Sequence, residues 1–167
     1  MSDTHLPTTH ITIVTGGAGS FAPEASAVGP RCVVIAADGG LDVARRAGLV
    51  AHHLVGDLDS VSMSARAWAE ESGVAIHRHP ADKDATDLEL ALDLAVELLG
   101  SAPPAEAMLR VVGPGAGRLD LLLGDVGLLA APRLGALEVR ASFGPAHLVV
   151  VPAGARRSLH AAVGEQL

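Results

Sequence analysis

The sequence predicts a protein of the α/β class, with three layers in which helices cover both faces of a mostly parallel sheet. Three observations support this prediction. Short, nearly continuous apolar runs alternate with segments whose apolar residues recur at helical spacing. Glycine or acidic residues follow most of the apolar runs, as they do at the ends of parallel strands. From about Leu134 the helical segments stop, and only strand-like runs follow.

Strands alternate with helices through the first part of the chain. The run Cys32–Ala37 is almost entirely apolar, as expected of a strand covered on both faces. Similar but weaker runs predict further strands at residues 11–15, 53–55, 74–77 and 108–112. Since parallel neighbours need crossover connections, this alternation is typical of a Rossmann-like sheet.

The predicted helices fill the segments between the strands. They cover residues 41–47, 62–72 and 84–99, and a leucine-rich stretch that follows Asp120 and stops near Pro132. The third helix is the clearest. Its apolar face holds Leu88, Leu92, Ala95 and Leu99, and its solvated stripe holds Glu89, Asp93 and Glu97.

The pattern after residue 134 indicates a different kind of structure. The runs Leu137–Ala141 and Leu148–Val151 are expected to be antiparallel strands without an intervening helix. The chain is therefore predicted to divide into an α/β domain, residues 1–133, and a partial β-strand extension, residues 134–167. That extension is too short to complete a second core, so we expect a truncated or naturally short form.

Composition narrows the range of partners. The net charge is −7 with no basic cluster, and the chain has only one Trp, two Phe and no Tyr, which argues against nucleic-acid and anionic-membrane partners. The single cysteine, Cys32, lies in a predicted buried strand, which excludes a disulfide framework and fits a reducing, cytoplasmic location. No run reaches the roughly 20 apolar residues of a membrane span.

Two acidic motifs are the main candidates for chemistry. Gly56-Asp57-Leu58-Asp59-Ser60 follows a predicted strand, and Asp82-Lys83-Asp84-Ala85-Thr86-Asp87 opens a predicted helix. Carboxylates meeting at a sheet edge beside a lysine suit Mg²⁺ and a polyphosphate. The alternatives are that Asp59 or Ser60 caps the next helix, that Asp84 and Asp87 form a capping box, and that Lys83, the only lysine, is a surface ion-pair residue.

Glycine-rich turns follow two other strands. Asp38-Gly39-Gly40 places an acid and two permissive residues where a backbone could approach a ligand closely, or where a tight turn is needed. The segment 113–120 repeats this arrangement, and its Arg118 could contact phosphate or pair with Asp120.

Two weaker signals point to other functions. Residues 17–22 fit the dinucleotide pattern G-x-G-x-x-A, with Asp38 about twenty residues on, but Pro23 and Gly29-Pro30 leave little room for the required helix. His77 and His79 would share one face of a strand. With no third ligand nearby, a zinc site there is disfavoured, and His52 and His53 are interpreted as surface or strand-edge residues.

In combination, four segments resemble the catalytic domain of the thiamine pyrophosphokinases. They are residues 37–40, 56–60, 82–89 and 117–120, and their order and spacing match over roughly residues 11 to 131. The resemblance implies that residues 1–133 bind ATP and transfer its pyrophosphoryl group to the hydroxyl of thiamine, giving thiamine diphosphate and AMP. It also implies a homodimer, and a thiamine site that is shared with a β domain beginning near residue 134.

The resemblance also implies roles for individual residues. Asp57, Asp59 and Asp87 would hold Mg²⁺. The nucleotide would lie against Asp38, Gly39, Gly40, Lys83, Asp84 and Thr86, with Lys83 and Thr86 on the polyphosphate. Arg118 and Asp120 would face the reacting end, and either Asp59 or Asp120 would accept the hydroxyl proton.

One departure from the family pattern concerns the acceptor. Many members have His and Asn where this chain has Leu121 and Asp125. The alternatives therefore include a nucleotide-binding remnant without acceptor activity and a pyrophosphokinase for another alcohol, such as a pterin. An NAD-binding protein is the weakest alternative.

Overall fold

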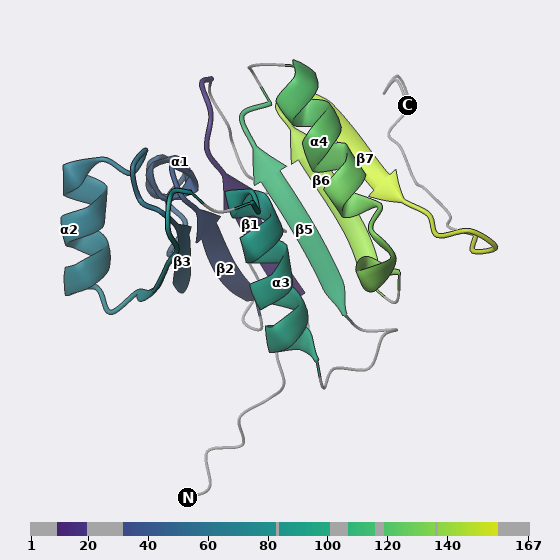
Figure 1. Cartoon of the computed structure of the whole chain (residues 1–167), viewed down its shortest axis with the longest axis horizontal. Coiled ribbons are helices and arrows are strands. Elements are labelled where there is room, and N and C mark those ends of the chain that lie inside the picture. Colours follow the sequence, from purple (N-terminus) through teal and green to yellow (C-terminus); the bar gives the residue numbers. More distant parts are fainter. Residues whose placement is uncertain are drawn as a thin grey trace, which may run out of the picture.

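The computed structural model describes residues 10–19, 32–82, 84–100, 107–115, 119–135 and 137–156. Within these ranges the chain forms a seven-stranded mixed sheet and four α-helices (Figure 1). The strands are β1 (His10–Thr15), β2 (Cys32–Ala37), β3 (His53–Gly56), β4 (Ala75–Arg78), β5 (Met108–Gly113), β6 (Glu138–Phe143) and β7 (Ala146–Val150). The helices are α1 (Gly40–Arg46), α2 (Met63–Glu71), α3 (Asp87–Leu99) and α4 (Leu119–Leu129), followed by the short 3-10 helix η2 (Pro132–Leu134).

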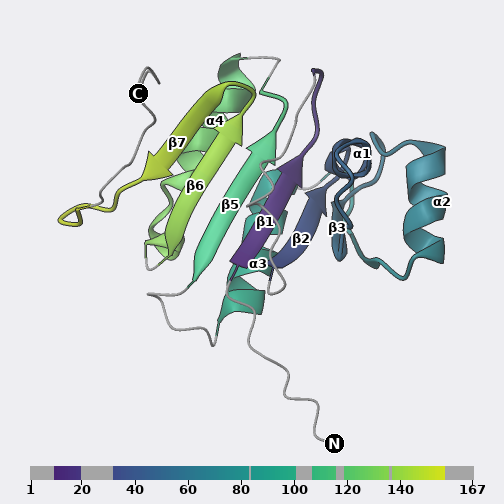
Figure 2. The ribbon, with the colours of Figure 1, turned by 180° about the vertical axis from the view of Figure 1, so that it is seen from behind.

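The strand order is β4-β3-β2-β1-β5-β6-β7. All neighbouring strands are parallel except β6 and β7, which are antiparallel. The carboxyl ends of the first six strands therefore lie at one edge of the sheet, which Figure 2 shows from behind. The order reverses between β1 and β5, and such a switch point is where open α/β sheets bind ligands.

Helices pack against the sheet from two directions. On β1, Ile11 and Ile13 belong to the same apolar cluster as Leu88 and Leu92 of α3. The alternate residue Val14 instead packs with Val43 of α1. This alternation follows from the two-residue period of a strand, and it explains why both faces of β1 are apolar.

Most predicted elements are confirmed to within a few residues. The near-continuous run of β2 is buried along its length, with only Val33 partly exposed. Helix α3 begins at Asp87 rather than at residue 84, because Thr86 rather than Asp84 caps it. Trp68 is only partly buried, and the guanidinium of Arg45 lies 5.1 Å from its ring centroid. None of the described helices has the length and apolar character required to cross a membrane.

The two strands after residue 134 join the same sheet. β6 pairs in parallel with β5, and β7 pairs antiparallel with β6, as expected for that pair. Val139, Ala141 and Phe143 of β6 are buried in the cluster that contains Leu109 of β5. The sequence did not predict the parallel β5–β6 pairing. The assignment of residues 134–167 to a second domain stays a prediction.

Candidate active site

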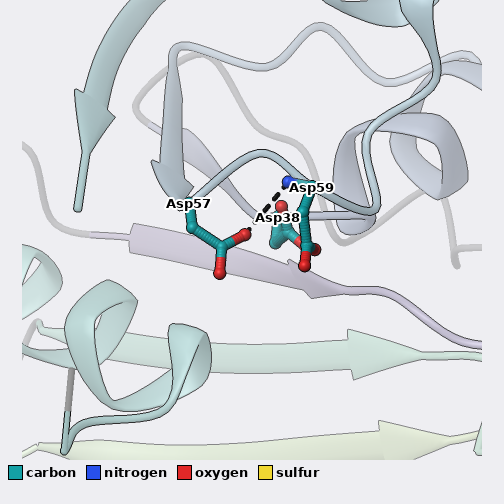
Figure 3. A group of neighbouring side chains, drawn as sticks. All are labelled: Asp38, Asp57 and Asp59. Carbon is teal, nitrogen blue, oxygen red and sulfur yellow. Dashed lines mark hydrogen bonds between the residues drawn. The ribbon is translucent and has the colours of Figure 1, made fainter. Parts of the chain in front are cut away.

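Three carboxylates meet where β2 and β3 end. Asp38 follows β2, and Asp57 and Asp59 follow β3, which is the neighbour of β2 in the sheet. One carboxylate oxygen from each residue lies within 4.8 Å of those of the other two, and Figure 3 shows the side chains together. The sequence predicted the convergence of Asp57 and Asp59, but it placed Asp38 beside the nucleotide rather than in the cluster.

A fourth carboxylate, that of Asp87, reaches the same place from the first turn of α3. A Cβ atom at Gly56 would lie 3.0 Å from Asp87 Oδ1 and 2.9 Å from the Cβ of Asp38. Gly56 also has φ +146°, a backbone conformation that favours glycine. The missing side chain at position 56 therefore lets Asp38 and Asp87 approach from two sides.

The electrostatics of Asp59 reflect this crowding. Its pKa is raised chiefly by the negative charge of Asp57, then by desolvation, and further by the charges of Asp38 and Asp87. Like charges close together disfavour ionisation, and a divalent cation would relieve the repulsion. The donor set consists of carboxylate oxygens, which are the ligands that Mg²⁺ prefers.

The loop that carries Asp57 and Asp59 is stabilised by a hydrogen bond within it and by a buried side chain. Asp57 Oδ1 accepts a hydrogen bond of 3.0 Å from the backbone N–H of Asp59. Between them, Leu58 has φ +70°, which is uncommon for a residue with a side chain, and that side chain is only 6% exposed. It packs in the cluster that includes Leu41 of α1 and Ala65 of α2. Burial of Leu58 thus stabilises a strained backbone conformation beside two site residues.

Ser60 links the two loops. Its hydroxyl donates a hydrogen bond to Asp38 Oδ2 and accepts one of 3.2 Å from the backbone N–H of Gly39. Asp38 also has a positive φ of 45°, and its own N–H donates to the carbonyl of Val55 at 2.8 Å. In the sequence Ser60 stood out only as a possible helix cap. The cap of α2 is instead Ser62, which accepts from the N–H of Ala65.

Close packing explains why residues 39 and 40 are glycines. A Cβ atom at Gly40 would lie 1.9 Å from the carbonyl oxygen of Val14, and one at Gly39 would lie 2.9 Å from the hydroxyl of Ser60. Both contacts are within the protein. The predicted approach of these glycines to a nucleotide stays a prediction.

The second acidic motif is described except for Lys83, which lies outside the described residues. Thr86 is the N-cap of α3, and its hydroxyl accepts from the N–H of Glu89 at 3.1 Å. The capping box considered for Asp84 and Asp87 is therefore wrong, because the cap and its partner are Thr86 and Glu89. Asp84 is exposed just before the helix.

The third motif lies at the start of α4. Arg118 falls outside the described residues, and Asp120 is exposed in the first turn of the helix. Leu121 is exposed as well, whereas Asp125 is partly buried, and this burial raises the pKa of its carboxyl. Whether Asp120 takes part in the site stays a prediction.

The histidines form a pair that the sequence did not reveal. His53 Nδ1 and His77 Nε2 are 3.0 Å apart and share a hydrogen bond across β3 and β4. Burial lowers the pKa of His53, and the charges of His77 and His52 lower it further. His52 instead accepts a hydrogen bond of 3.0 Å from the N–H of Val34. The sequence predicted a surface or strand-edge residue at position 53, whereas His53 is partly buried and forms half of a cross-strand pair.

These features define the class of the protein. It is an α/β protein with a carboxylate site suited to a divalent cation, at the edge of the sheet where parallel strands end. The family model described as the thiamin pyrophosphokinase catalytic domain matches residues 27–140. The chain therefore belongs to the family of the thiamin pyrophosphokinase catalytic domain.

Individual relatives agree with this assignment. A thiamine pyrophosphokinase of Bacillus subtilis is 30% identical over 145 residues, which cover 86% of this chain and 65% of the relative. The solved structure of the Bacillus subtilis enzyme gives a TM-score of 0.65 at 27% identity, over 80% of this chain and 60% of that one. A family protein from Enterococcus faecalis gives 0.64 at 26% identity, over 81% and 62%. The chain thus spans less than two thirds of the length of these relatives.

Proposed function

We propose that this chain is an ATP-dependent pyrophosphokinase that converts thiamine and ATP into thiamine diphosphate and AMP. The observation that supports this most strongly is the convergence of Asp38, Asp57, Asp59 and Asp87 at one end of the sheet. Carboxylates in this number repel a polyphosphate, so a nucleotide can bind there only with a divalent cation between them. Family membership supports ATP and thiamine as the substrates.

Mg²⁺ fits the donor set, and Asp57, Asp59 and Asp87 would hold it, with Oδ1 of Asp38 as a further ligand. When bound, the ion would supply charge neutralisation on the phosphate oxygens of ATP. Asp38 supports this fit, because it is only 6% exposed and its Oδ1 has no hydrogen-bond partner among the described residues. A buried carboxylate oxygen without a partner is costly unless a cation or a donor reaches it.

The remaining residues would bind and orient the substrates. Lys83 and Thr86 are proposed to contact the polyphosphate, and Asp84 would lie beside them. Gly39 and Gly40 would border the nucleotide. Arg118 and Asp120 would face the reacting end, where the thiamine oxygen bonds to the β-phosphorus as the bond to the leaving AMP breaks. Asp59 or Asp120 would take the hydroxyl proton.

Finer points of the assembly are part of the same proposal. We propose a cytoplasmic homodimer without nucleic-acid or membrane partners, in which residues 134–167 contribute to a thiamine-binding β domain. We also propose a Rossmann-like, three-layer architecture. The packing of β1 residues against α3 on one side and α1 on the other supports it.

One experiment tests the proposed reaction. The full chain is incubated with ATP, Mg²⁺ and thiamine, and the products are separated and identified by mass spectrometry. Thiamine diphosphate and AMP in equal amounts are expected, and chelation of the cation should abolish both. Nucleotide binding without product would favour a nucleotide-binding protein, and product only from a pterin alcohol would favour another acceptor. Tight NAD binding that ignores Mg²⁺ would contradict the proposal.

A further inference from the structure

Asp38 offers a cation only one of its two oxygens. Its Oδ2 accepts the hydrogen bond from Ser60, whereas Oδ1 is buried and has no hydrogen-bond partner among the described residues. Asp38 contributes an oxygen to the group with Asp57 and Asp59. The backbone of Asp38 is also fixed, because its N–H donates a hydrogen bond to the carbonyl of Val55 on the neighbouring strand. The carboxylate is therefore fixed in position before any cation arrives.

The direction of the Ser60 hydroxyl is fixed as well. A serine hydroxyl has one proton, and the N–H of Gly39 occupies a lone pair of the Ser60 oxygen. The single proton is thus directed to Asp38 Oδ2. Since residue 39 has no side chain, Ser60 can come this close: a Cβ atom there would lie 2.9 Å from the hydroxyl oxygen.

We infer that Ser60 is a positioning residue that makes the site select Mg²⁺ over Ca²⁺, by holding Asp38 to single-oxygen coordination. The inference rests on the cation site of the proposed function. Mg²⁺ needs near-octahedral geometry with one oxygen from each carboxylate, at about 2.0–2.1 Å. Ca²⁺ accepts about 6–8 oxygens and uses carboxylates that bind through both oxygens. A hydroxyl that occupies Oδ2 therefore costs Ca²⁺ a ligand that Mg²⁺ does not use.

The test compares two substitutions at Ser60. Ser60→Ala removes the hydroxyl and frees Oδ2, and because Ser60 is exposed the change leaves no buried cavity. Ser60→Thr keeps a hydroxyl, and its extra methyl group can extend into solvent. Ser72→Ala, an exposed serine that ends α2, is the matched control.

Cation binding is measured directly, without nucleotide and without a reaction. The full chain is titrated with Mn²⁺ and the free ion is followed by electron paramagnetic resonance, and then Mg²⁺ or Ca²⁺ is added to displace it. For Ser60→Ala we expect Mg²⁺ affinity to fall by roughly 10-fold, as is typical when the partner of a metal ligand is removed. Ca²⁺ affinity should hold or rise, so the ratio of the two affinities falls by about the same factor or more. Ser60→Thr and Ser72→Ala should keep the parent ratio.

The possible outcomes distinguish the role of Ser60 from the existence of the cation site. An unchanged ratio in Ser60→Ala, with both affinities equally reduced or both intact, would overturn the role of Ser60 and leave the cation site standing. A parent protein that does not bind Mn²⁺ at all would overturn the cation site and this inference together. Circular dichroism of each variant shows whether the fold is retained, so a lost ratio in a folded variant is attributable to the site.

Discussion

Charged side chains are arranged differently in two regions of the molecule, the carboxyl ends of β2 and β3 and the face of the β6–β7 pair. At the first, carboxylates of the same sign gather, and neither Asp38 nor Asp59 forms an ion pair within the described residues. On the second, Arg140 binds Glu138 at 2.6 Å and Ser142 shares a hydrogen bond of 3.0 Å with His147. The β6–β7 face satisfies its own polar groups. At the carboxyl ends of β2 and β3, here called the acidic end, Asp38 Oδ1 is buried without a hydrogen-bond partner among the described residues, so we place function there.

The largest expected effect comes from removing one charge of the cluster. Asp57→Asn should reduce Mg²⁺-dependent nucleotide binding by about 100-fold, because loss of a ligand should cost at least as much as loss of a ligand's partner, which costs about 10–100-fold. Without Mg²⁺ the variant should melt no earlier than the parent, since like-charge repulsion has been relieved. Isothermal titration calorimetry and thermal unfolding measure the two effects.

The control for Asp57→Asn is Glu71→Gln, the same chemical change at an exposed position of α2. It should leave both measurements at the parent values. If Asp57→Asn kept the parent affinity for the Mg²⁺-nucleotide complex, the proposed cation site at the acidic end would be wrong.

A backbone change comes next. Gly56→Ala should destabilise the fold by roughly 2–4 kcal/mol, because the new Cβ meets Asp38 and Asp87 and the residue has φ +146°. Gly73→Ala is the matched control. Gly73 also has a positive φ, of 74°, but a Cβ there meets nothing within 4 Å, so the cost should be about 1–2 kcal/mol. Chemical denaturation of both variants would contradict the steric argument if their losses were equal.

The pair of His53 and His77, which lies outside the acidic cluster, should make the free energy of unfolding depend on pH. The lowered pKa of His53 means that the unfolded chain takes up a proton at a higher pH than the folded chain does. Its contribution to stability is therefore present above the unfolded pKa of about 6.5 and is lost as the pH falls toward the folded pKa. Unfolding free energies measured from pH 7.5 down to 5.5 should fall, and the fall should be smaller in His53→Gln.

The control for this pH dependence is His147→Gln, an exposed residue on β7. It should keep the fall in stability of the parent protein. If His53→Gln and the parent had equal pH dependence, the cross-strand pair would not contribute to it.

The smallest effect is expected where charges are already paired. Glu138→Gln weakens the partly exposed ion pair with Arg140 and should cost less than about 1 kcal/mol. Mg²⁺ affinity should not change. A large loss of cation binding in this variant would erase the distinction between the two regions.

Much of the fold could be predicted because each element carries a local signal. The apolar run of β2 and the four-residue spacing in α3 reflect burial, which sequence records directly. The parallel pairing of β6 with β5 carries no such signal. It depends on how α4 returns the chain to the sheet, and that is a property of the connection rather than of the strand.

The site was predicted less completely, for a related reason. Asp57 and Asp59 were identified because they are close in sequence and follow a strand. The addition of Asp38 and the role of Ser60 depend on contacts between two loops that are 22 residues apart in sequence. The capping of α3 was misassigned because Thr86 and Asp84 are both good caps, and only the backbone conformation distinguishes them.

Leu58 connects the acidic end to the packing between α1 and α2, because its buried side chain separates Asp57 from Asp59 in the sequence. Any adjustment of that packing, such as a larger residue in place of Ala65, would shift the loop on which both carboxylates stand. Efforts to make this half of the molecule more heat-resistant by refilling its interior would therefore change its ion affinity as a side effect, and the two properties would have to be optimised together.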